Sequence, residues 1–558
     1  MENLTVYNMP PQPALWDRIG IFFVSFASTW TFLVICGMVF CWYNRNSPVM
    51  KVRGWVLGFT AIICLHMYWL MAQIVYPVGR TMPIVIAYDV QYFIMGTWFP
   101  LGIAMFHASN LRFLHVAKLQ KQFTHPALQR HHDGCNGAKT SLLCRLRNIS
   151  YSKRIMVFIG FGMVAQCILT VGMWFACMKY HPTYGIPGTE MKSKTLPEQV
   201  IELGRGWEWW PSVMWQVLWT WIVAPILIFR AWNIRDTMGW RAQTIGCCLS
   251  SLHATPMFLI SSYVPAFDKV NAYFPPSQWL HLSTMMFEIF TVFVPAFQII
   301  RSQIIARRAK DSNSRWETAS QTSTLRSSTS DWKLHTLEVA EKGKPIDFTD
   351  AAIGDRLITM KALDHVLAEN PAPLLEFSSL NDFSGENIAF LNLLSRWKAT
   401  HASVEHARFS SEVYSGALQL YIDFISPLDA QFPLNLPSKK LKHLQAVFEV
   451  AARSVRGEGR YNAATPFDFD NEESAVGLSN VQYTGQIPGS FELEIFDEVQ
   501  DHIKYLVLTN TWPKFVMEMQ NRRRSTDTGR SALTDDSQAT LKSQISARVK
   551  NLLKSIYH

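Results

Sequence analysis

The chain has 558 residues, enough for more than one domain, and a formal net charge of +9. A basic balance of this kind fits a nucleic acid or a membrane surface as partner. The basic residues lie mainly between long apolar runs in residues 19–300, whereas residues 301–558 hold most of the acidic side chains. This distribution favours a membrane protein with a soluble C-terminal half, and it argues against nucleic-acid binding.

Seven apolar runs are each long enough to cross the roughly 30 Å hydrocarbon core of a bilayer as a helix. Five contain no Asp, Glu, Lys or Arg, the third contains only Asp89, and the seventh contains only Glu288. Tryptophan and tyrosine gather near their ends, as is typical of a membrane interface. We predict helices over Ile19–Tyr43, Trp55–Val78, Ile84–Ser109, Ile155–Met178, Trp209–Phe229, Ala242–Phe267 and Trp279–Ile300.

The charge of the intervening segments predicts the orientation of these spans. One set of segments carries 19 Lys or Arg residues and consists of residues 44–54, 110–154, 230–241 and 301–310. The alternate set carries seven and consists of residues 1–18, 79–83, 179–208 and 268–278. The positive-inside rule places the basic set in the cytosol. We therefore expect an extracellular N-terminus, with an N-glycosylation sequon at Asn3, and a cytosolic C-terminal half, in a plasma-membrane protein.

Ionisable residues inside the spans are candidates for function, because burying them in hydrocarbon is costly. They are His66, Asp89, His107, His253, His281 and Glu288. In one interpretation, Asp89, His66, His253 and Glu288 form an intramembrane site for an extracellular small-molecule ligand. In the simpler one, Asp89, His107 and His281 lie near helix ends in water, and the other three pair with the backbone or with each other. No metal-ligand spacing occurs, and we expect no metal, no cofactor and no structural disulfide.

The predicted membrane domain, residues 19–305, is followed by a Ser- and Thr-rich stretch over 306–347. This stretch is poor in aliphatic side chains, so we predict a linker. From residue 348 to 520, apolar residues recur with helical periodicity, as at Phe390, Leu391, Leu394 and Trp397 and again at Val499 and Ile503. This pattern predicts an all-α bundle with an atypical insert at about 455–490. The tail, residues 521–558, contains a basic amphipathic helix over 541–556 that would either bind membrane lipid or pack on the predicted bundle.

Three phrases in the soluble half carry further information. The first is FSGENIAFL at residues 383–391, and the second is ALQLYIDFIS at 417–426, followed by Leu434, Asn435 and Leu436. The third begins with FDEVQ at 496–500 and continues to NTWPKF at 510–515. In order and spacing they resemble the regulator of G-protein signalling (RGS) family, over roughly residues 355–520. The whole chain is similar to the seven-span RGS proteins of filamentous fungi and plants.

The resemblance implies a cytosolic all-helical RGS bundle behind a seven-helix transmembrane bundle, with a GTP-bound Gα subunit as partner. It also implies which residues contact Gα. These residues are Glu386, Asn387, Asn435, Leu506, Asn510, Thr511 and Lys514. The family usually has Asp, Ser and Arg at the last three positions, so this chain departs from the pattern there. Lysine cannot make the bidentate contacts of arginine.

The activity implied is acceleration of the GTPase of Gα, without chemistry of the chain's own. Gα already carries its catalytic arginine and glutamine, so a helper only has to hold the switch loops of Gα in their transition-state arrangement. Two other hypotheses remain. The chain is a receptor whose RGS-like tail only docks Gα without accelerating hydrolysis, or it is a transporter or membrane enzyme with an added regulatory domain. The matching Asn435 phrase favours acceleration over docking alone.

Overall fold

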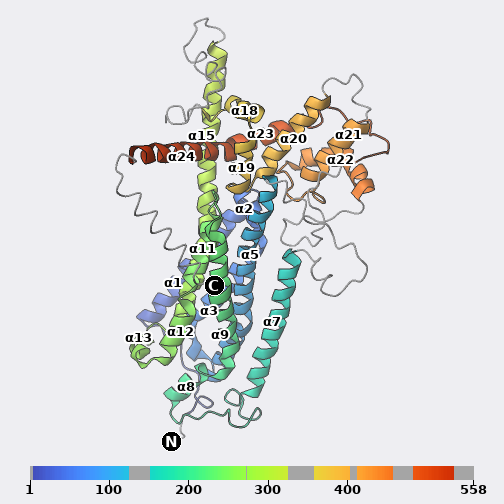
Figure 1. Cartoon of the computed structure of the whole chain (residues 1–558). Coiled ribbons are helices and arrows are strands. Elements are labelled where there is room, and N and C mark those ends of the chain that lie inside the picture. The colour runs from blue at the N-terminus through green and yellow to red at the C-terminus, as the bar shows by residue number, and fades with distance from the viewer. Residues whose placement is uncertain are drawn as a thin grey trace, which may run out of the picture. The chain divides into compact units, whose positions relative to one another are not determined.

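The computed structural model describes residues 4–124, 151–271, 273–323, 357–401, 411–456 and 482–532. The predicted sequon at Asn3 and the predicted amphipathic helix over 541–556 lie outside these ranges. Two compact units form. The first consists of Met1–Arg301 with Leu375–Glu498, and the second of Ser302–Leu374 with Val499–His558. All longer regular elements that the structure describes are helices (Figure 1), as predicted.

The seven predicted spans are all helical, and each is long and apolar enough to cross a membrane. The chain is therefore described as a multi-pass membrane protein. The first two spans are α1 (Arg18–Tyr43) and α3 (Trp55–Val78), and the fourth is α7 (Tyr151–Ala176). The other four are built from pairs of helices: α4 (Ile84–Phe93) and α5 (Phe99–Gln120), α9 (Trp210–Val217) and α10 (Ala224–Trp232), α11 (Trp240–Ser251) and α12 (Ala254–Tyr263), α14 (Ser277–Glu288) and α15 (Val294–Ser323).

Prolines explain three of these divisions. A π-helical turn joins the two parts of the third, fifth and seventh spans, at Ile94–Trp98, Leu218–Val223 and Ile289–Phe293. In each case a proline follows within the first two residues of the next helix. Proline lacks an N–H and clashes with the preceding turn, and a π turn absorbs both effects without ending the helix.

Two spans extend further than predicted. The third continues through α5 to Gln120 and a 3₁₀ turn at Lys121–Phe123, and the seventh continues through α15 to Ser323. Residues 306–323 of the predicted linker are therefore helical. No glycine or proline interrupts residues 301–323, so nothing in the sequence ends the helix where the apolar run stops. Residues 324–347 of the predicted linker and residues 348–356 of the predicted bundle lie outside the described part.

The loops gather at two separate ends of the membrane half, residues 4–301. At one end, which we call the basic end, the Arg53 guanidinium donates to Met238 O at 2.7 Å and Arg112 Nε donates to Val52 O at 3.3 Å. At the other end, Val6 N–H donates to the Gln199 side chain at 3.0 Å. The segments of the basic set thus contact one another, as the alternating topology requires. The short helices α2 (Pro48–Arg53) and α8 (Leu196–Gly204) lie at these two ends.

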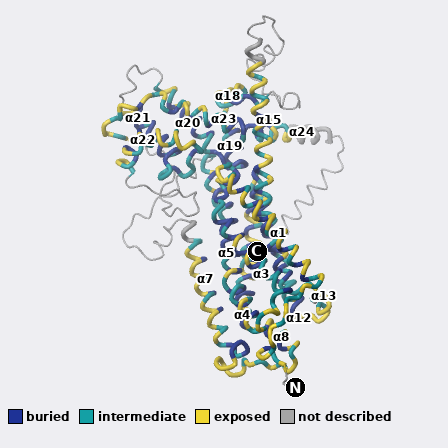
Figure 2. Tube along the Cα trace, turned by 180° about the vertical axis from the view of Figure 1, so that it is seen from behind, coloured by how far each residue is buried: buried dark blue, intermediate teal, exposed yellow. Residues whose placement is uncertain are grey.

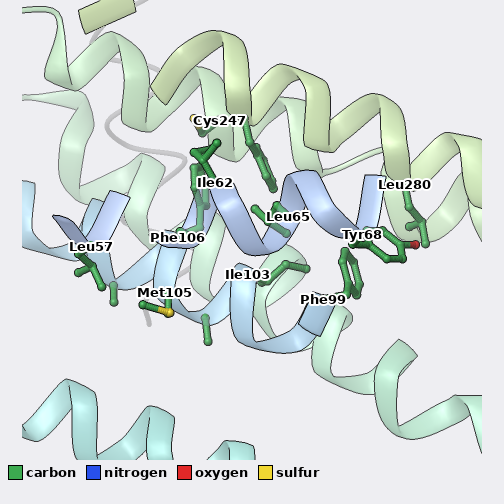
Figure 3. Close-up of a cluster of buried hydrophobic side chains, with 14 of the residues drawn as sticks. Leu57, Ile62, Leu65, Tyr68, Phe99, Ile103, Met105, Phe106, Cys247 and Leu280 are labelled. Atoms are coloured by element: carbon green, nitrogen blue, oxygen red, sulfur yellow. The ribbon is translucent and has the colours of Figure 1, made fainter. Parts of the chain in front are cut away.

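The core of the membrane half lies between α3, α5, α11 and α14 (Figure 3). Leu65, Ile103 and Phe106 meet there, with Leu280 from α14 and Cys247 from α11. By contrast, α7 carries exposed apolar side chains along most of its length, including Phe158 and Phe161 (Figure 2). Exposed apolar residues on this scale fit contact with lipid rather than water.

The soluble half supplies helices to both units. Three of them belong to the first unit: α20 (Gly385–His401), α21 (Ser411–Phe424) and α22 (Ser438–Arg456). The predicted apolar face of Phe390, Leu391, Leu394 and Trp397 is buried on α20. Phe390 and Trp397 make edge contacts with the ring of Phe496. Helix α22 enters the predicted insert and ends at Arg456, and residues 457–481 of that insert lie outside the described part.

The second unit contains α18 (Met360–Glu369), α23 (Asp497–Leu506, from Val499 on) and α24 (Trp512–Ala532). A salt bridge joins Lys504 on α23 to Asp364 on α18 at 2.7 Å, and Trp512 Nε1 donates to Leu357 O at 2.7 Å. Val499 and Ile503 are buried, as their spacing predicts. A π turn at Val507–Thr511 joins α23 to α24 just before Pro513, as in the membrane spans. Helix α19 (Ala372–Leu380) passes from one unit to the other.

The close packing of α3 on α5 gives a stability prediction. A Cβ added at Gly102 would lie 2.8 Å from Leu65 Cγ, whereas one added at Gly160 on α7 would meet nothing within 4 Å. We expect Gly102→Ala to lower the midpoint of thermal unfolding in detergent, because Leu65 has to move. The matched change Gly160→Ala should leave it unchanged or raise it, since alanine favours a helix by about 1 kcal/mol over glycine. Equal midpoints for the two variants would contradict the packing.

Candidate functional site

Two of the predicted intramembrane residues, His66 and Glu288, form a buried pair between α3 and α14. Glu288 is 0% exposed and His66 is 8% exposed. His66 Nδ1 lies 2.8 Å from Glu288 Oε1, and His66 Nε2 lies 3.0 Å from Thr31 Oγ1 on α1. The indole N–H of Trp30 donates to the other carboxylate oxygen of Glu288. Three helices therefore satisfy the polar atoms of this pair.

The local structure around Glu288 explains how the carboxylate reaches its partners. Glu288 is the last residue of α14 and directly precedes the π turn at Ile289–Phe293. Such turns change the direction of the side chains that follow and often occur at functional sites. On the other side of the pair, the His66 ring stacks on Trp69, with ring centroids 5.4 Å apart. The imidazole is therefore fixed by a ring contact and by both of its nitrogens.

The other two residues of the predicted intramembrane site come from two other spans, the third and the sixth. Asp89 on α4 is partly exposed and accepts a hydrogen bond from Trp174 Nε1 on α7 at 2.8 Å. His253 lies in the turn between α11 and α12, and its Nε2 has no hydrogen-bond partner in the described part of the chain. The structure thus brings His66 and Glu288 together and gives Asp89 a separate partner.

The expectation that His107 and His281 lie in water is wrong. Both are 1% exposed, in the interior of the membrane half. The His107 ring stacks on Trp219 at 5.2 Å, and the His281 ring lies 4.9 Å from the ring of Tyr68. Among the described residues, neither nitrogen of His281 has a hydrogen-bond partner, and the Tyr68 hydroxyl has none either. Their aromatic neighbours come from other spans, which the position of a histidine along its own span does not reveal.

A polar line between α3 and α14 was missed in the sequence. Gln73 and Gln278 exchange side-chain hydrogen bonds, with Gln73 Nε2 donating to Gln278 Oε1 at 3.0 Å. Together with His66 on α3 and with His281 and Glu288 on α14, they place polar groups along one contact between two spans. Residues 66 and 73 are seven apart, as are 281 and 288, so each pair falls on one helix face. This spacing is the signal that could have found the line.

The first unit also contains three of the residues predicted to bind Gα. Glu386 and Asn387 lie in the first turn of α20, and both are partly buried. Asn435 lies in the loop between α21 and α22 and is partly exposed. The loops before Glu386 and before Asn435 pack on one apolar cluster, to which Phe383 belongs and against which Phe432 packs. Two phrases that are far apart in the sequence are thereby brought together.

The start of α20 contacts Gln120, the last residue of α5 at the basic end of the membrane half. The Gln120 carboxamide accepts a hydrogen bond from Gly385 N–H and donates to Glu386 Oε2, both at 3.1 Å. A Cβ added at Gly385 would lie 2.2 Å from Ser379 Oγ and 3.0 Å from Gln120 Oε1. Only glycine therefore allows the backbone to approach this closely.

A second connection joins residues 381–383 to the segment between α10 and α11. Thr237 N–H donates to Asn381 O at 2.9 Å, and the Thr237 hydroxyl donates to Asp382 Oδ1 at 2.6 Å. Next to them, Phe383 is buried against Phe113 and Trp240. Among the described residues, Phe383 is the one non-glycine residue with a positive φ, +47°. Such a conformation is strained for a phenylalanine and needs support from its surroundings.

Burial at this contact changes the acidity of Glu386. Removal from water raises the pKa of its carboxyl group to about 7, from an ordinary value of 4.5. The nearby charge of Asp382 adds to the increase, while the Gln120 hydrogen bond and the Lys51 charge oppose it. Lys51 also donates to Pro433 O at 3.4 Å, in the loop that carries Asn435.

The other four residues predicted to bind Gα belong to the second unit. Leu506 is partly buried at the end of α23, and Thr511 is 2% exposed in the π turn. Asn510 and Lys514 are linked, since Lys514 Nζ donates to Asn510 Oδ1 at 2.9 Å. Asparagine and lysine here form a hydrogen bond where an Asp and Arg pair would form an ion pair. The role of these four residues stays a prediction.

Comparisons with models of protein families, with curated proteins and with solved structures found no match to this chain.

The buried pair of His66 and Glu288 gives a prediction about stability. We expect Glu288→Leu or His66→Leu alone to cost about 3 kcal/mol or more, because each leaves a buried polar partner without its hydrogen bonds. The double variant should cost clearly less than the sum, since both polar groups are then gone. Unfolding of the four forms in detergent measures the coupling. Additive costs would mean that the two side chains do not interact.

The raised pKa of Glu386 gives a prediction about pH. The docked loop favours the protonated carboxyl, so this contribution to docking is present below about pH 4.5 and is lost as pH rises through about 7. Protection of the amides of residues 381–387 from hydrogen exchange, corrected for the intrinsic rate, should decrease over that interval. Glu386→Gln should remove most of the dependence. The same decrease in that variant would assign it to other groups.

Proposed function

We propose that this chain is a membrane-tethered regulator of heterotrimeric G-protein signalling. Its soluble half accelerates GTP hydrolysis by a Gα subunit, and its seven-helix half acts as a sensor or receptor in the plasma membrane, with the soluble half in the cytosol. The resemblance of three phrases to the RGS family supports this assignment. So does the distribution of charge between the two sets of loops.

The observation that carries the proposal is that two loops pack on one apolar cluster. The loop that leads into Glu386 and Asn387 and the loop that contains Asn435 share the cluster of Phe383 and Phe432. Both loops begin or end at helices of the first unit, α20 and α22. Polar side chains at the ends of rigid helices suit a module that binds a partner in a fixed geometry.

The chemistry asked of these residues is modest. A Gα subunit supplies the arginine and the glutamine that act on the phosphate and on the attacking water. The helper lowers the barrier only if it binds the transition-state arrangement of the switch loops better than the ground state. The Asn435 carboxamide suits this role because it both donates and accepts hydrogen bonds. The Glu386 carboxylate can accept hydrogen bonds from backbone N–H groups of a switch loop.

The alternative, a receptor whose tail docks Gα without accelerating hydrolysis, predicts binding with equal affinity to the GTP-bound and transition-state forms. Single-turnover GTP hydrolysis by candidate Gα subunits, with and without the full chain in lipid nanodiscs, separates the two functions. Acceleration supports the proposal. Binding without acceleration supports the alternative.

The same assay tests the role of Asn435. We expect Asn435→Ala to reduce the acceleration by about tenfold or more, equivalent to the loss of a hydrogen bond worth about 1.4 kcal/mol in the transition state. Lys439→Gln is the matched control, because Lys439 is exposed in the first turn of α22, four residues away. The thermal midpoint of both variants should equal that of the parent. Full activity of Asn435→Ala would show that the residue does not act on Gα.

A further inference from the structure

Residues 381–387 and 432–435 form the two loops that lead to Glu386, Asn387 and Asn435. Both loops are in contact with the basic end of the membrane half. Gln120, Thr237 and Lys51 come from three different segments of that end, and each hydrogen-bonds to one of the loops. Aromatic contacts accompany them, since Phe123 lies 6.0 Å from Phe432 and Phe113 lies 5.9 Å from Phe383, between ring centroids. The contact is thus distributed over both loops.

The hydrogen bonds at this contact use the groups that a Gα subunit would need. At the start of α20, the Gln120 side chain hydrogen-bonds to the carboxylate of Glu386 and to the N–H of Gly385. The neighbouring Asn387 Oδ1 is buried and has no hydrogen-bond partner among the described residues. A buried acceptor without a partner costs free energy, and so does a buried carboxyl group. The docked loop therefore has its recognition groups covered or unsatisfied.

The backbone conformation of the docked loop also costs free energy. Phe383 holds a positive φ while its ring packs edge-on against Phe113 of the membrane half, in the apolar cluster that also contains Trp240. The apolar contact offsets the strain only while the loop is docked. The backbone strain and the unsatisfied polar groups disfavour docking, whereas burial of the aromatic ring favours it. A modest change at the basic end can therefore reverse the balance between the docked and released states.

We infer that the membrane half regulates the soluble half by docking these two loops, so that docking at the basic end and binding of Gα exclude each other. This inference rests on the proposed function. The elements that hold the loops are α5, through Phe113 and Gln120, and the segment leading into α11, through Thr237 and Trp240. A shift of either relative to the loops breaks the contacts and exposes Glu386 and Asn387.

A reversible crosslink tests the inference in the full chain. Thr237→Cys with Asp382→Cys places two thiols at positions whose side chains are in contact, so a disulfide should form under oxidation. The crosslinked protein in nanodiscs should lose its acceleration of single-turnover GTP hydrolysis by about fivefold or more, within the usual range of allosteric coupling, and regain it on reduction. Each single-cysteine variant under the same oxidant controls for the nine native cysteines.

A release variant supplies the opposite change. Gln120→Ala removes the hydrogen bonds to Gly385 and Glu386 without altering the soluble half, and should increase the acceleration. Lys118→Gln is the matched control, because Lys118 is exposed on the same helix, and should leave it unchanged. Failure of the disulfide to form, or full activity of the crosslinked protein, would overturn the docking. So would an unchanged rate in Gln120→Ala.

These results also separate the inference from the function beneath it. If the parent, the crosslinked protein and the Gln120→Ala variant all accelerate hydrolysis equally, the proposed function stands and the docking inference fails. If no form accelerates hydrolysis by any Gα tested although the disulfide forms, the proposed function fails, and the regulatory role fails with it.

Discussion

The absence of water inside a bilayer is the constraint on which the membrane half depends. Backbone groups in the hydrocarbon must find partners within the protein, which restricts the seven spans to helices. In three spans a π turn absorbs a proline that would otherwise leave carbonyl groups unpaired, and the helix continues without a break. The same constraint acts on polar side chains, so Glu288 is shared between His66 and Trp30, and Gln73 pairs with Gln278.

Outside the bilayer this constraint is relaxed, and favourable and unfavourable contributions to the contacts nearly offset each other. At the basic end, Gln120 and Thr237 hold a loop whose Phe383 is strained and whose Asn387 oxygen is unsatisfied. Helix α5, which ends at Gln120, packs along its length against α3, the helix that carries His66. One helix therefore packs against the span that carries His66 and also holds the loops that we propose to bind Gα. A rigid helix of this kind can move as a unit.

Much of the fold could be predicted from the sequence, because hydrophobic length and period determine it. The seven apolar runs became seven helical spans, and the face of Phe390, Leu394 and Trp397 is buried as its spacing predicts. The ends of spans were harder, since α15 continues through residues without glycine or proline into the predicted linker. Where a charged or polar run follows an apolar one, the apolar pattern ends, but the helix can continue.

The candidate sites were predicted less completely. His66 and Glu288 were both singled out as costly to bury, and the structure joins them. Asp89 was grouped with them, but its partner Trp174 comes from a different span. The burial of His281 against Tyr68 depends on how two helices face each other, which a single sequence does not specify. The contact of Gln120 with Glu386 joins residues that are 266 positions apart, and no local sequence pattern predicts it.

The central claim is that the soluble half recognises the transition-state arrangement of a Gα subunit. The most direct measurement is the affinity of the Gln120→Ala full chain, in nanodiscs, for one Gα in three states: bound to GDP, to a nonhydrolysable GTP analogue, and to GDP with fluoroaluminate, which mimics the transition state. Acceleration requires the tightest binding to the fluoroaluminate form and the weakest to the GDP form. Equal affinity for all three states, or no binding to any, would contradict it.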